Sequence, residues 1–290
     1  MTMDAAGYYA HLTPQYRHYG GRTHGWHYGI WEPDVETHHD ALRRSNELLL
    51  RGLNITPATR ILDVGCGEGG FAVWAALRLG ACVTGITICR DHVALAERLA
   101  AKHDVASKCR FLVMHMEQLA FQADHFDVVV NQETACYAKD KGRYLAGIRR
   151  VLAPGGVWRS LDFSIQSGEL PAGVDRHYRD VCDGFHIPSL APLQTVVELA
   201  AGAGLDVLEA SDLTPAVLPT AATIRRQCYL PLVARTLRLD WTVYSRDPLR
   251  RRHRRGHILA AHRYSRGLER GVFRYTYVSA RKPARGQAVP

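Results

Sequence analysis

Arg60-Ile-Leu-Asp-Val-Gly-Cys-Gly-Glu-Gly-Gly70 is the stretch of sequence that decides the fold. A short apolar strand runs into a glycine-rich loop, and the loop runs into a segment with helical character. Glycine lets the backbone turn sharply and lets a ligand approach the main chain, and the helix N-terminus beyond presents free N–H groups. The spacing Gly65-x-Gly67-x-Gly69 lacks the final spacing of the dinucleotide fingerprint G-x-G-x-x-G.

Asp63, at the end of the strand, suits the ammonium group of an amino-acid moiety better than a pyrophosphate. The loop therefore predicts a ligand with a cationic end. The alternative interpretation is a structural turn that holds no ligand.

Strands and helices alternate from this point on, which predicts an α/β fold. The strands are near-continuous apolar runs, and such runs are typical of a mostly parallel sheet that is buried on both faces by helices. A helix precedes the first strand. A capping box at Thr37 and Asp40 marks its beginning, and Gly52 marks its end. We expect strands at Arg60–Val64, Cys82–Thr87, Cys109–Met114, Phe126–Asn131, Val157–Ser164, Leu205–Ala210 and Phe273–Ala280, and helices at Phe71–Leu79, His92–His103, Asp140–Leu152 and Pro192–Ala203.

Two segments stand outside this alternation. The first, Met1–Trp31, is dense in aromatic residues, whereas disordered segments are poor in them. We expect it to be an arm or lid. The second, about 60 residues from Ser211 to Gly271, is too long for a simple crossover and predicts a helical lid insertion before the last strand. The chain thus divides into an arm and helix (1–55), a cofactor-binding core (56–212), the insertion (213–271) and the last strand with its tail (272–290).

The pattern D-x-G-x-G-x-G that begins at Asp63 resembles the signature of class I S-adenosylmethionine-dependent methyltransferases. The turn Leu152-Ala-Pro-Gly-Gly156 resembles the L-x-P-G-G turn that precedes strand five in that family. The resemblance covers roughly residues 60–281. It implies a Rossmann-like sheet of seven strands and S-adenosyl-L-methionine as the cofactor. The loop residues implied to bind this cofactor are Asp63, Gly65, Cys66, Gly67 and Gly69.

The second predicted strand ends Val83-Thr-Gly-Ile-Thr87, where the family usually places an acidic residue that holds both ribose hydroxyls. Thr87 occupies that position, and one hydroxyl cannot accept twice as a carboxylate does. The segment resembles a narrower branch of cyclopropane fatty acid synthases, sterol and tocopherol methyltransferases, and prenyl C-methyltransferases. Within that branch, a prenyl-indole C-methyltransferase of the teleocidin type is one candidate.

Further short motifs resemble the same branch. His27-Tyr-Gly-Ile30 resembles the H-Y-G-I of geranyl diphosphate C-methyltransferases, which implies that Tyr28 meets the cofactor carboxylate. Asn131-Gln-Glu-Thr134 resembles the segment after strand four in prenyl and sterol enzymes. The alternatives are that Tyr28 only packs in a core and that Glu133 only caps a helix. The remaining cofactor contacts implied by the resemblance are Thr87, Met116, Glu117 and Asn131, with His115 in place of a common aspartate.

The first functional hypothesis is methyl transfer to an alkene carbon of an isoprenoid-bearing small molecule, through a carbocation, in natural-product biosynthesis. Glu133 and Tyr137 are its catalytic candidates, because a carboxylate and aromatic faces stabilise a cation. Its predicted substrate-binding residues are Tyr16, Tyr19 and Trp26. The second hypothesis is O- or N-methylation, for which a base is needed; the candidate bases are His11, His18, His24 and His27. The third is a non-catalytic or RNA-binding module on the same fold.

Charge and composition limit the partners. The 290 residues carry a formal net charge of +9, and arginines between 246 and 270 supply much of the excess. The segment is open to three interpretations: a solvated helix face, a contact with an anionic ligand or a second copy, or a surface that binds nucleic acid. We expect no nucleic-acid partner. No apolar run approaches 18 residues, so we expect a cytoplasmic protein without a transmembrane helix. The seven cysteines have no zinc spacing, so we expect no metal site, and the aromatic arm favours a homo-oligomer.

Overall fold

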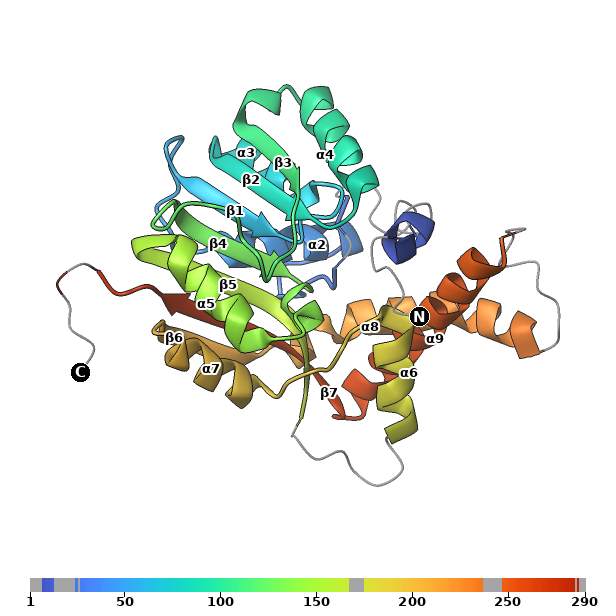
Figure 1. Cartoon of the computed structure of the whole chain (residues 1–290). Coiled ribbons are helices and arrows are strands. Elements are labelled where there is room, and N and C mark those ends of the chain that lie inside the picture. The colour runs from blue at the N-terminus through green and yellow to red at the C-terminus, as the bar shows by residue number, and fades with distance from the viewer. Residues whose placement is uncertain are drawn as a thin grey trace.

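The computed structural model describes residues 7–12, 24–25, 27–166, 175–236, 247–284 and 286. Its centre is one seven-stranded sheet with the order β3-β2-β1-β4-β5-β7-β6 (Figure 1). The first five strands pair in parallel, and β7 runs antiparallel to both β5 and β6. The predicted α/β fold with a seven-stranded, mostly parallel sheet is therefore confirmed. The strands are β1 (Arg60–Val64), β2 (Cys82–Thr87), β3 (Cys109–Val113), β4 (Phe126–Gln132), β5 (Leu152–Ile165), β6 (Asp206–Asp212) and β7 (Phe273–Arg281).

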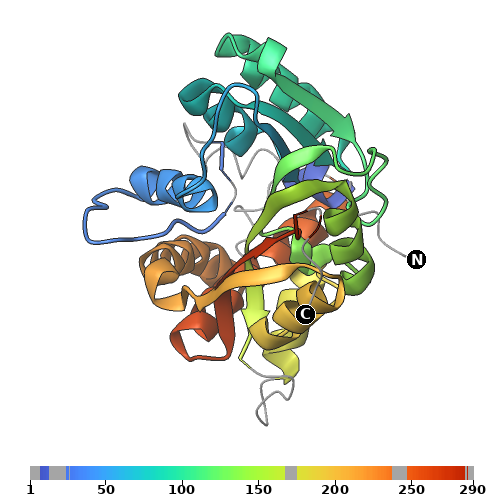
Figure 2. The ribbon, with the colours of Figure 1, turned by 90° about the vertical axis from the view of Figure 1, so that its left-hand side faces the viewer.

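Helices cover both faces of the sheet, as the apolar character of the strands predicts. Two successive residues of β1 face opposite sides of the sheet. Ile61 belongs to the apolar cluster with helices α2, α3 and α4, and Leu62 belongs to the cluster with α5 and α7. Figure 2 shows these two helical layers on opposite sides of the strands. The helices are α2 (His38–Leu50), α3 (Gly70–Leu79), α4 (Arg90–Lys102), α5 (Lys141–Val151), α6 (Asp175–Phe185), α7 (Leu193–Gly202), α8 (Thr214–Thr236) and α9 (Pro248–Glu269).

Local signals explain where several elements begin and end. Thr37 caps α2, and its hydroxyl accepts a hydrogen bond from the backbone N–H of Asp40 at 3.1 Å, as the capping box predicts. Gly80 ends α3 in the left-handed conformation, with φ of 70°. Strand β5 begins at Leu152 rather than at the expected Val157, because the Pro-Gly-Gly segment is absorbed into the strand as an irregularity opposite β4. Helix α6 is not expected from the sequence pattern.

Helices α6, α8 and α9 gather at one end of the molecule, and Figure 1 shows the helical segment at residues 7–12 between α9 and α4. Helices α6 and α9 approach closely because each contributes a glycine: a Cβ placed on Gly184 would lie 2.3 Å from the carbonyl oxygen of Gly256. The predicted helical insertion before the last strand is thus present as α8 and α9, and α6 joins it. Within the described residues, no helix is long and apolar enough to cross a membrane.

Candidate functional site

The glycine-rich loop follows β1 and is fixed to the neighbouring strand. The backbone N–H groups of Gly65 and Cys66 both donate to the carbonyl of Ile86 at 2.9 Å. Gly65, Gly67 and Gly69 all have positive φ, which glycine adopts without steric cost. The first and third have packing reasons as well, because their Cβ atoms would lie 2.3 Å from the side chain of Thr134 and 2.8 Å from that of Ala96.

Gly67 differs from the other two glycines of the loop. A Cβ placed on it would meet nothing within 4 Å among the described residues. The backbone here is therefore open to an incoming ligand, and the free N–H groups at the start of α3 lie just beyond it. The structure separates the roles that the sequence assigned jointly to the glycines: two shape the loop, and Gly67 leaves space.

Asp63 lies at the carboxyl end of β1 and is only 4% exposed. Its Oδ2 atom is buried without a hydrogen-bond partner among the described residues, and burial raises the pKa of the carboxyl group to about 7. Buried carboxylate oxygens in native proteins are normally hydrogen-bonded, so an orphaned one calls for a ligand that donates. An ammonium group would supply both the donor and the opposite charge. These residues therefore fit the amino-acid end of S-adenosylmethionine.

The other predicted cofactor contacts lie where β2 and β3 end. The carbonyl of Thr87 accepts a hydrogen bond from the N–H of Met114 at 2.9 Å, so the two strand ends stay side by side. The carboxylate of Glu117 accepts from the N–H of Asp140 at 2.6 Å, which links this edge to the start of α5. Met116 packs, half-buried, against the cluster on the α5 side of the sheet. The ends of β1, β2 and β3 thus form one edge, where open α/β sheets bind ligands.

Asn131 is placed differently from the expectation. It is fully buried, and its amide nitrogen donates to Ser160 Oγ at 2.8 Å and to Asp162 Oδ2 at 3.3 Å. Its amide oxygen accepts from the hydroxyl of Tyr144 at 3.0 Å and from Trp158 Nε1 at 2.9 Å. An amide has two donors and two acceptor sites, so its capacity is filled within the protein. The side chain of Asn131 therefore fixes β4 to β5 and α5. The predicted contact of Asn131 with the cofactor stays a prediction.

Glu133 follows β4 with φ of 51°, an unusual conformation for a residue other than glycine. Its Oε1 accepts a hydrogen bond from the backbone N–H of Tyr28 at 2.5 Å, and its carboxyl group also interacts with Tyr275. Burial nevertheless raises the pKa of Glu133 to about 8. The backbone of Tyr28 thus meets Glu133, and the hydroxyl of Tyr28 lies 2.9 Å from the hydroxyl of Ser265 on α9. The expected contact of Tyr28 with the cofactor carboxylate stays a prediction.

An aromatic cluster packs around the ring of Tyr28, the residue whose backbone N–H donates to this carboxyl group. The ring of Tyr28 lies edge-on to Phe163 and Tyr264, with centroid separations of 5.8 and 5.7 Å. It also lies 5.8 Å from the ring of Tyr275. The four rings come from the arm, β5, β7 and α9, which are distant in the sequence. A buried carboxyl group beside an aromatic cluster is an arrangement that suits a cationic species.

Asp162 is a residue of this region that the sequence reasoning missed. It is buried in β5, and its Oδ2 accepts hydrogen bonds from the backbone N–H groups of Thr134 at 3.1 Å and Cys136 at 3.2 Å. These bonds hold the loop that carries Glu133 and Tyr137. An acidic residue between Leu161 and Phe163 was the available signal, but the loop N–H groups that it accepts from are named by no sequence pattern.

The N-terminal arm reaches this edge through residues 7–12. The ring of Tyr9 lies 5.9 Å from Tyr137 and 5.8 Å from His92, both edge-on. Tyr8 is 1% exposed, and its hydroxyl donates to the carbonyl of Gly184 at 3.1 Å. This segment packs on its own chain, so it gives no reason to expect a second copy. The predicted substrate contacts Tyr16, Tyr19 and Trp26 lie outside the described residues.

The histidines considered as bases occupy varied positions. His27 is buried, its Nδ1 lies 3.1 Å from the carbonyl of Tyr28, and burial lowers its pKa to about 4. His11 lies 3.0 Å from His253 on α9, nitrogen to nitrogen. The Nδ1 atom of His24 lies 3.6 Å from Oε2 of Glu68 in the glycine-rich loop. His18 lies outside the described residues.

Comparison with known sequences agrees with this geometry. The family described as a methyltransferase domain matches residues 62–159. The methyltransferase GfsG of Streptomyces halstedii is 28% identical over 68% of this chain and 72% of its own length. Tocopherol O-methyltransferase of Arabidopsis thaliana is 28% identical over 68% of this chain, and 24-methylenesterol C-methyltransferase 2 of the same plant is 29% identical over 61%. The matches span 64% and 50% of those two proteins.

Solved structures share the whole fold. The [4+2]-cyclase SpnF superposes with a TM-score of 0.77 at 21% identity, over 96% of each chain. Geranyl diphosphate C-methyltransferase from Streptomyces coelicolor A3(2) superposes with a TM-score of 0.70 at 19% identity, again over 96% of each chain. The fold, the family match and the open glycine loop beside an orphaned carboxylate lead to one conclusion. The chain is an S-adenosylmethionine-dependent methyltransferase, and residues 62–159 carry its methyltransferase domain.

Proposed function

We propose that this enzyme transfers a methyl group to an alkene carbon of an isoprenoid-bearing small molecule, in the biosynthesis of a natural product. The observation that supports the proposal is the buried carboxyl group of Glu133, which meets Tyr28 and Tyr275 of an aromatic cluster at the carboxyl end of β4. Oxygen and nitrogen acceptors need a base that removes a proton. An alkene needs none, but its methylation leaves a cation that must be stabilised and kept from water.

When bound, S-adenosylmethionine supplies an electrophilic methyl group on its sulfonium. The chain's own part is to hold the cofactor at Asp63 and Gly67 and to orient the acceptor opposite the methyl group. The rings of Tyr28 and Tyr275 then face the forming cation through their negative quadrupoles. Glu133 stabilises this charge more strongly than it stabilises the neutral alkene, so its effect is selective for the transition state.

The protonation of Glu133 fits this role. With a pKa near 8, its carboxyl group is mainly protonated at pH 7 before ligands bind. A positive charge nearby favours the ionised form and lowers the pKa. Glu133 is therefore ionised when the cationic cofactor, or the cation formed on the substrate, lies next to it. Its pKa then lies close to the working pH, which is favourable for a group that takes a proton from the cation.

The relatives include both reaction types. The printed names of a sterol enzyme and a geranyl diphosphate enzyme refer to C-methylation, and that of the tocopherol enzyme refers to O-methylation. An O- or N-methyltransferase is the second candidate. His27 is poorly suited as its base, since burial disfavours the protonated ring that would form when it accepts a proton. His24 beside Glu68 is the better base for that reaction.

The predicted cofactor residues and the division of the chain belong to the same proposal. Asp63, the open position at Gly67, Thr87, Met116 and Glu117 would contact the cofactor along one edge of the sheet. The arm and the helices of the insertion would close over the acceptor, with Tyr137 and Tyr9 in the wall of its site.

The proposal is tested by replacing Glu133 with glutamine, which keeps the shape and removes the charge. We expect kcat to fall about 10²-fold, because electrostatic groups aimed at developing charge contribute on this order. The affinity for S-adenosylhomocysteine, measured by calorimetry, should stay the same. Glu97→Gln, at an exposed position on α4, is the matched control and should leave kcat unchanged. A Glu133→Gln enzyme with kcat within a few-fold of the wild type would reject the electrostatic role.

A further inference from the structure

Helix α9 has two faces of different character. Its inner face packs against the sheet and the arm through buried residues that include Ala260, Tyr264 and Ser265. Its outer face is basic, because the helix and its C-cap carry many arginines and only one acidic residue, Glu269. Glu269 is already paired with Arg225 of α8 at 3.1 Å. The positive charge on the outer face is therefore not balanced by the helix itself.

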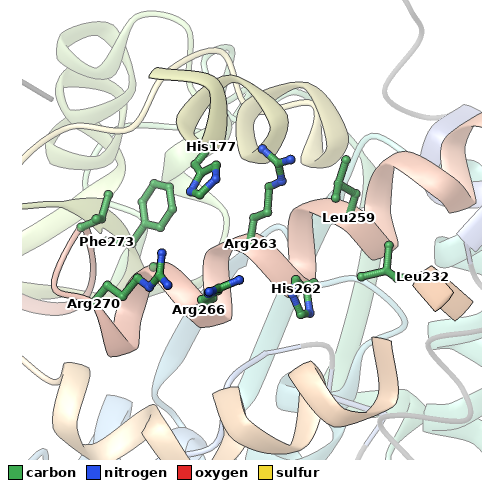
Figure 3. Close-up of a pocket in the computed structure, with 10 residues that line it drawn as sticks. His177, Leu232, Leu259, His262, Arg263, Arg266, Arg270 and Phe273 are labelled. Atoms are coloured by element: carbon green, nitrogen blue, oxygen red, sulfur yellow. The ribbon is translucent and has the colours of Figure 1, made fainter. Parts of the chain in front are cut away.

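A cavity of about 450 Å³ opens on this outer face, between α9, α8 and α6 (Figure 3). Its size is in the range of sites that bind small molecules. The lining falls into two parts. One part is apolar and consists of Leu232, Leu259, Val272 and Phe273; the other is basic and consists of His177, His262, Arg263, Arg266 and Arg270.

The charges in this cavity are incompletely neutralised. Arg263 forms an ion pair with Asp180 of α6. Within the described part of the chain, Arg266 and Arg270 have no carboxylate partner within ion-pair distance, and both are exposed at the cavity. They are four residues apart on one helix, where like charges repel each other. The arrangement is therefore less favourable without an anion than with one.

The pKa values of the two histidines in the cavity are affected by the same positive charges. The pKa of His177 is lowered by burial and by the positive charges of Arg263 and Arg270. The pKa of His262 is lowered by burial and by Arg266 and Arg225. An anion in the cavity would offset these charges. Guanidinium groups suit phosphate oxygens because they donate in a planar fork.

We propose that this cavity binds a phosphorylated amphiphile, a small molecule that carries a phosphate ester at one end and an apolar chain at the other. Arg266 and Arg270 would hold the phosphate at the mouth of the cavity, and Leu232, Leu259 and Val272 would contact the apolar chain. A dianionic phosphate matches two guanidinium groups that lack a carboxylate partner among the described residues better than a single carboxylate does.

The cavity is separate from the proposed methyl-transfer site. The inner face of α9 contacts that site through Ser265, whose hydroxyl meets Tyr28, whereas the cavity opens on the outer face. The ring of Phe273 lies between the two, packed against Tyr264 with a centroid separation of 5.1 Å. The proposal therefore does not depend on which atom is methylated.

Calorimetric titration of the full chain, saturated with S-adenosylhomocysteine, tests the proposal. Hexyl phosphate should bind, and it should bind at least about tenfold more tightly than inorganic phosphate or hexanol, since both ends contribute. The double variant Arg266→Gln/Arg270→Gln should weaken hexyl phosphate by about tenfold or more, as expected when charged hydrogen bonds are lost. The control Arg78→Gln/Arg98→Gln removes the same charge from exposed positions on α3 and α4 and should change the affinity less than about twofold, in line with screened surface charge.

Three results would overturn the proposal. One is equal affinity for hexyl phosphate in the two double variants, which would mean that only net charge matters. Another is binding of hexyl phosphate that S-adenosylhomocysteine abolishes, which would place the ligand in the methyl-transfer site. The third is binding to vesicles that contain phosphatidic acid without binding of soluble hexyl phosphate, which would make the basic face a membrane contact. All variants change exposed side chains, and their thermal unfolding should match that of the wild type.

Discussion

The backbone N–H of Tyr28 donates a hydrogen bond of 2.5 Å to Oε1 of Glu133, a residue 105 positions later in the chain. This bond joins the end of the N-terminal arm to the carboxyl end of β4. It holds the Glu133 carboxyl group in place although the backbone there has φ of 51°. Strained backbone of this kind persists only where the surroundings fix it, and it occurs often at functional sites.

The first prediction concerns Asp63 and pH. Free Asp63 has a pKa of about 7, and binding of the cofactor ammonium requires its ionised form. The affinity for S-adenosylhomocysteine should therefore be constant above pH 8 and weaken as pH falls below 7, approaching about tenfold per pH unit. Asp63→Asn should bind weakly and lose this pH dependence. Calorimetry from pH 5.5 to about 8.5 measures both, and an unchanged affinity in Asp63→Asn would contradict the assignment.

The second prediction uses two glycines with the same backbone requirement. Gly67 and Gly155 have φ of 52° and 79°, and a Cβ on either meets no atom within 4 Å in the described structure. Valine at either site causes backbone strain, on the order of 1–2 kcal/mol. Only Gly67→Val should also abolish S-adenosylhomocysteine binding, because only that side chain would fill the ligand's space. Equal binding in the two variants, measured by calorimetry, would show that Gly67 is only a turn residue.

The third prediction concerns the arm. Removal of residues 1–12 deletes Tyr9 from its contacts with Tyr137 and His92 but leaves the bond between Tyr28 and Glu133. We expect a folded protein that binds S-adenosylhomocysteine with wild-type affinity and has lost most of its turnover, because the acceptor site is no longer closed. Circular dichroism, calorimetry and a methyl-transfer assay measure the three properties. Full turnover in the shortened protein would show that the arm does not close the site.

The fourth prediction concerns Asp162, whose Oδ2 accepts from the backbone N–H groups of Thr134 and Cys136. In Asp162→Asn, an amide nitrogen that faces these donors would repel them, and buried unmet donors cost about 1–3 kcal/mol each. The midpoint of thermal unfolding should fall, and kcat measured well below that midpoint should fall too because Glu133 is no longer held. Asp206→Asn, at an exposed end of β6, is the control. Unchanged kcat in Asp162→Asn would remove it from the site.

The centre of the sheet could be predicted because β1 and β4 are buried on both faces and are therefore largely apolar along their length. The ends of α2 and α3 were readable from Thr37 and Gly80, which act locally. Helix α6 was missed because its sequence is mainly charged and its buried residues, among them Val181 and Phe185, form only a narrow stripe. Its partner α9 lies about 70 residues later, so no local pattern announces the contact.

The site divides in the same way. Asp63 and Gly67 are read from one contiguous motif, and the structure gives each a physical reason: an orphaned carboxylate oxygen and an open backbone position. The internal role of the Asn131 side chain could not be predicted, because its partners Ser160, Tyr144 and Trp158 reach it only after the sheet has formed. Pairings between distant segments set these roles, and a single sequence does not contain them in readable form.

The most direct test of the proposed reaction is the position of the transferred methyl group in the product. The enzyme is incubated with S-adenosylmethionine labelled with ¹³C in the methyl group and with the acceptor identified from cell metabolites, and the product is examined by NMR. We predict a labelled methyl carbon bonded directly to a carbon that was part of an alkene in the acceptor. A labelled methyl group on oxygen or nitrogen would contradict it.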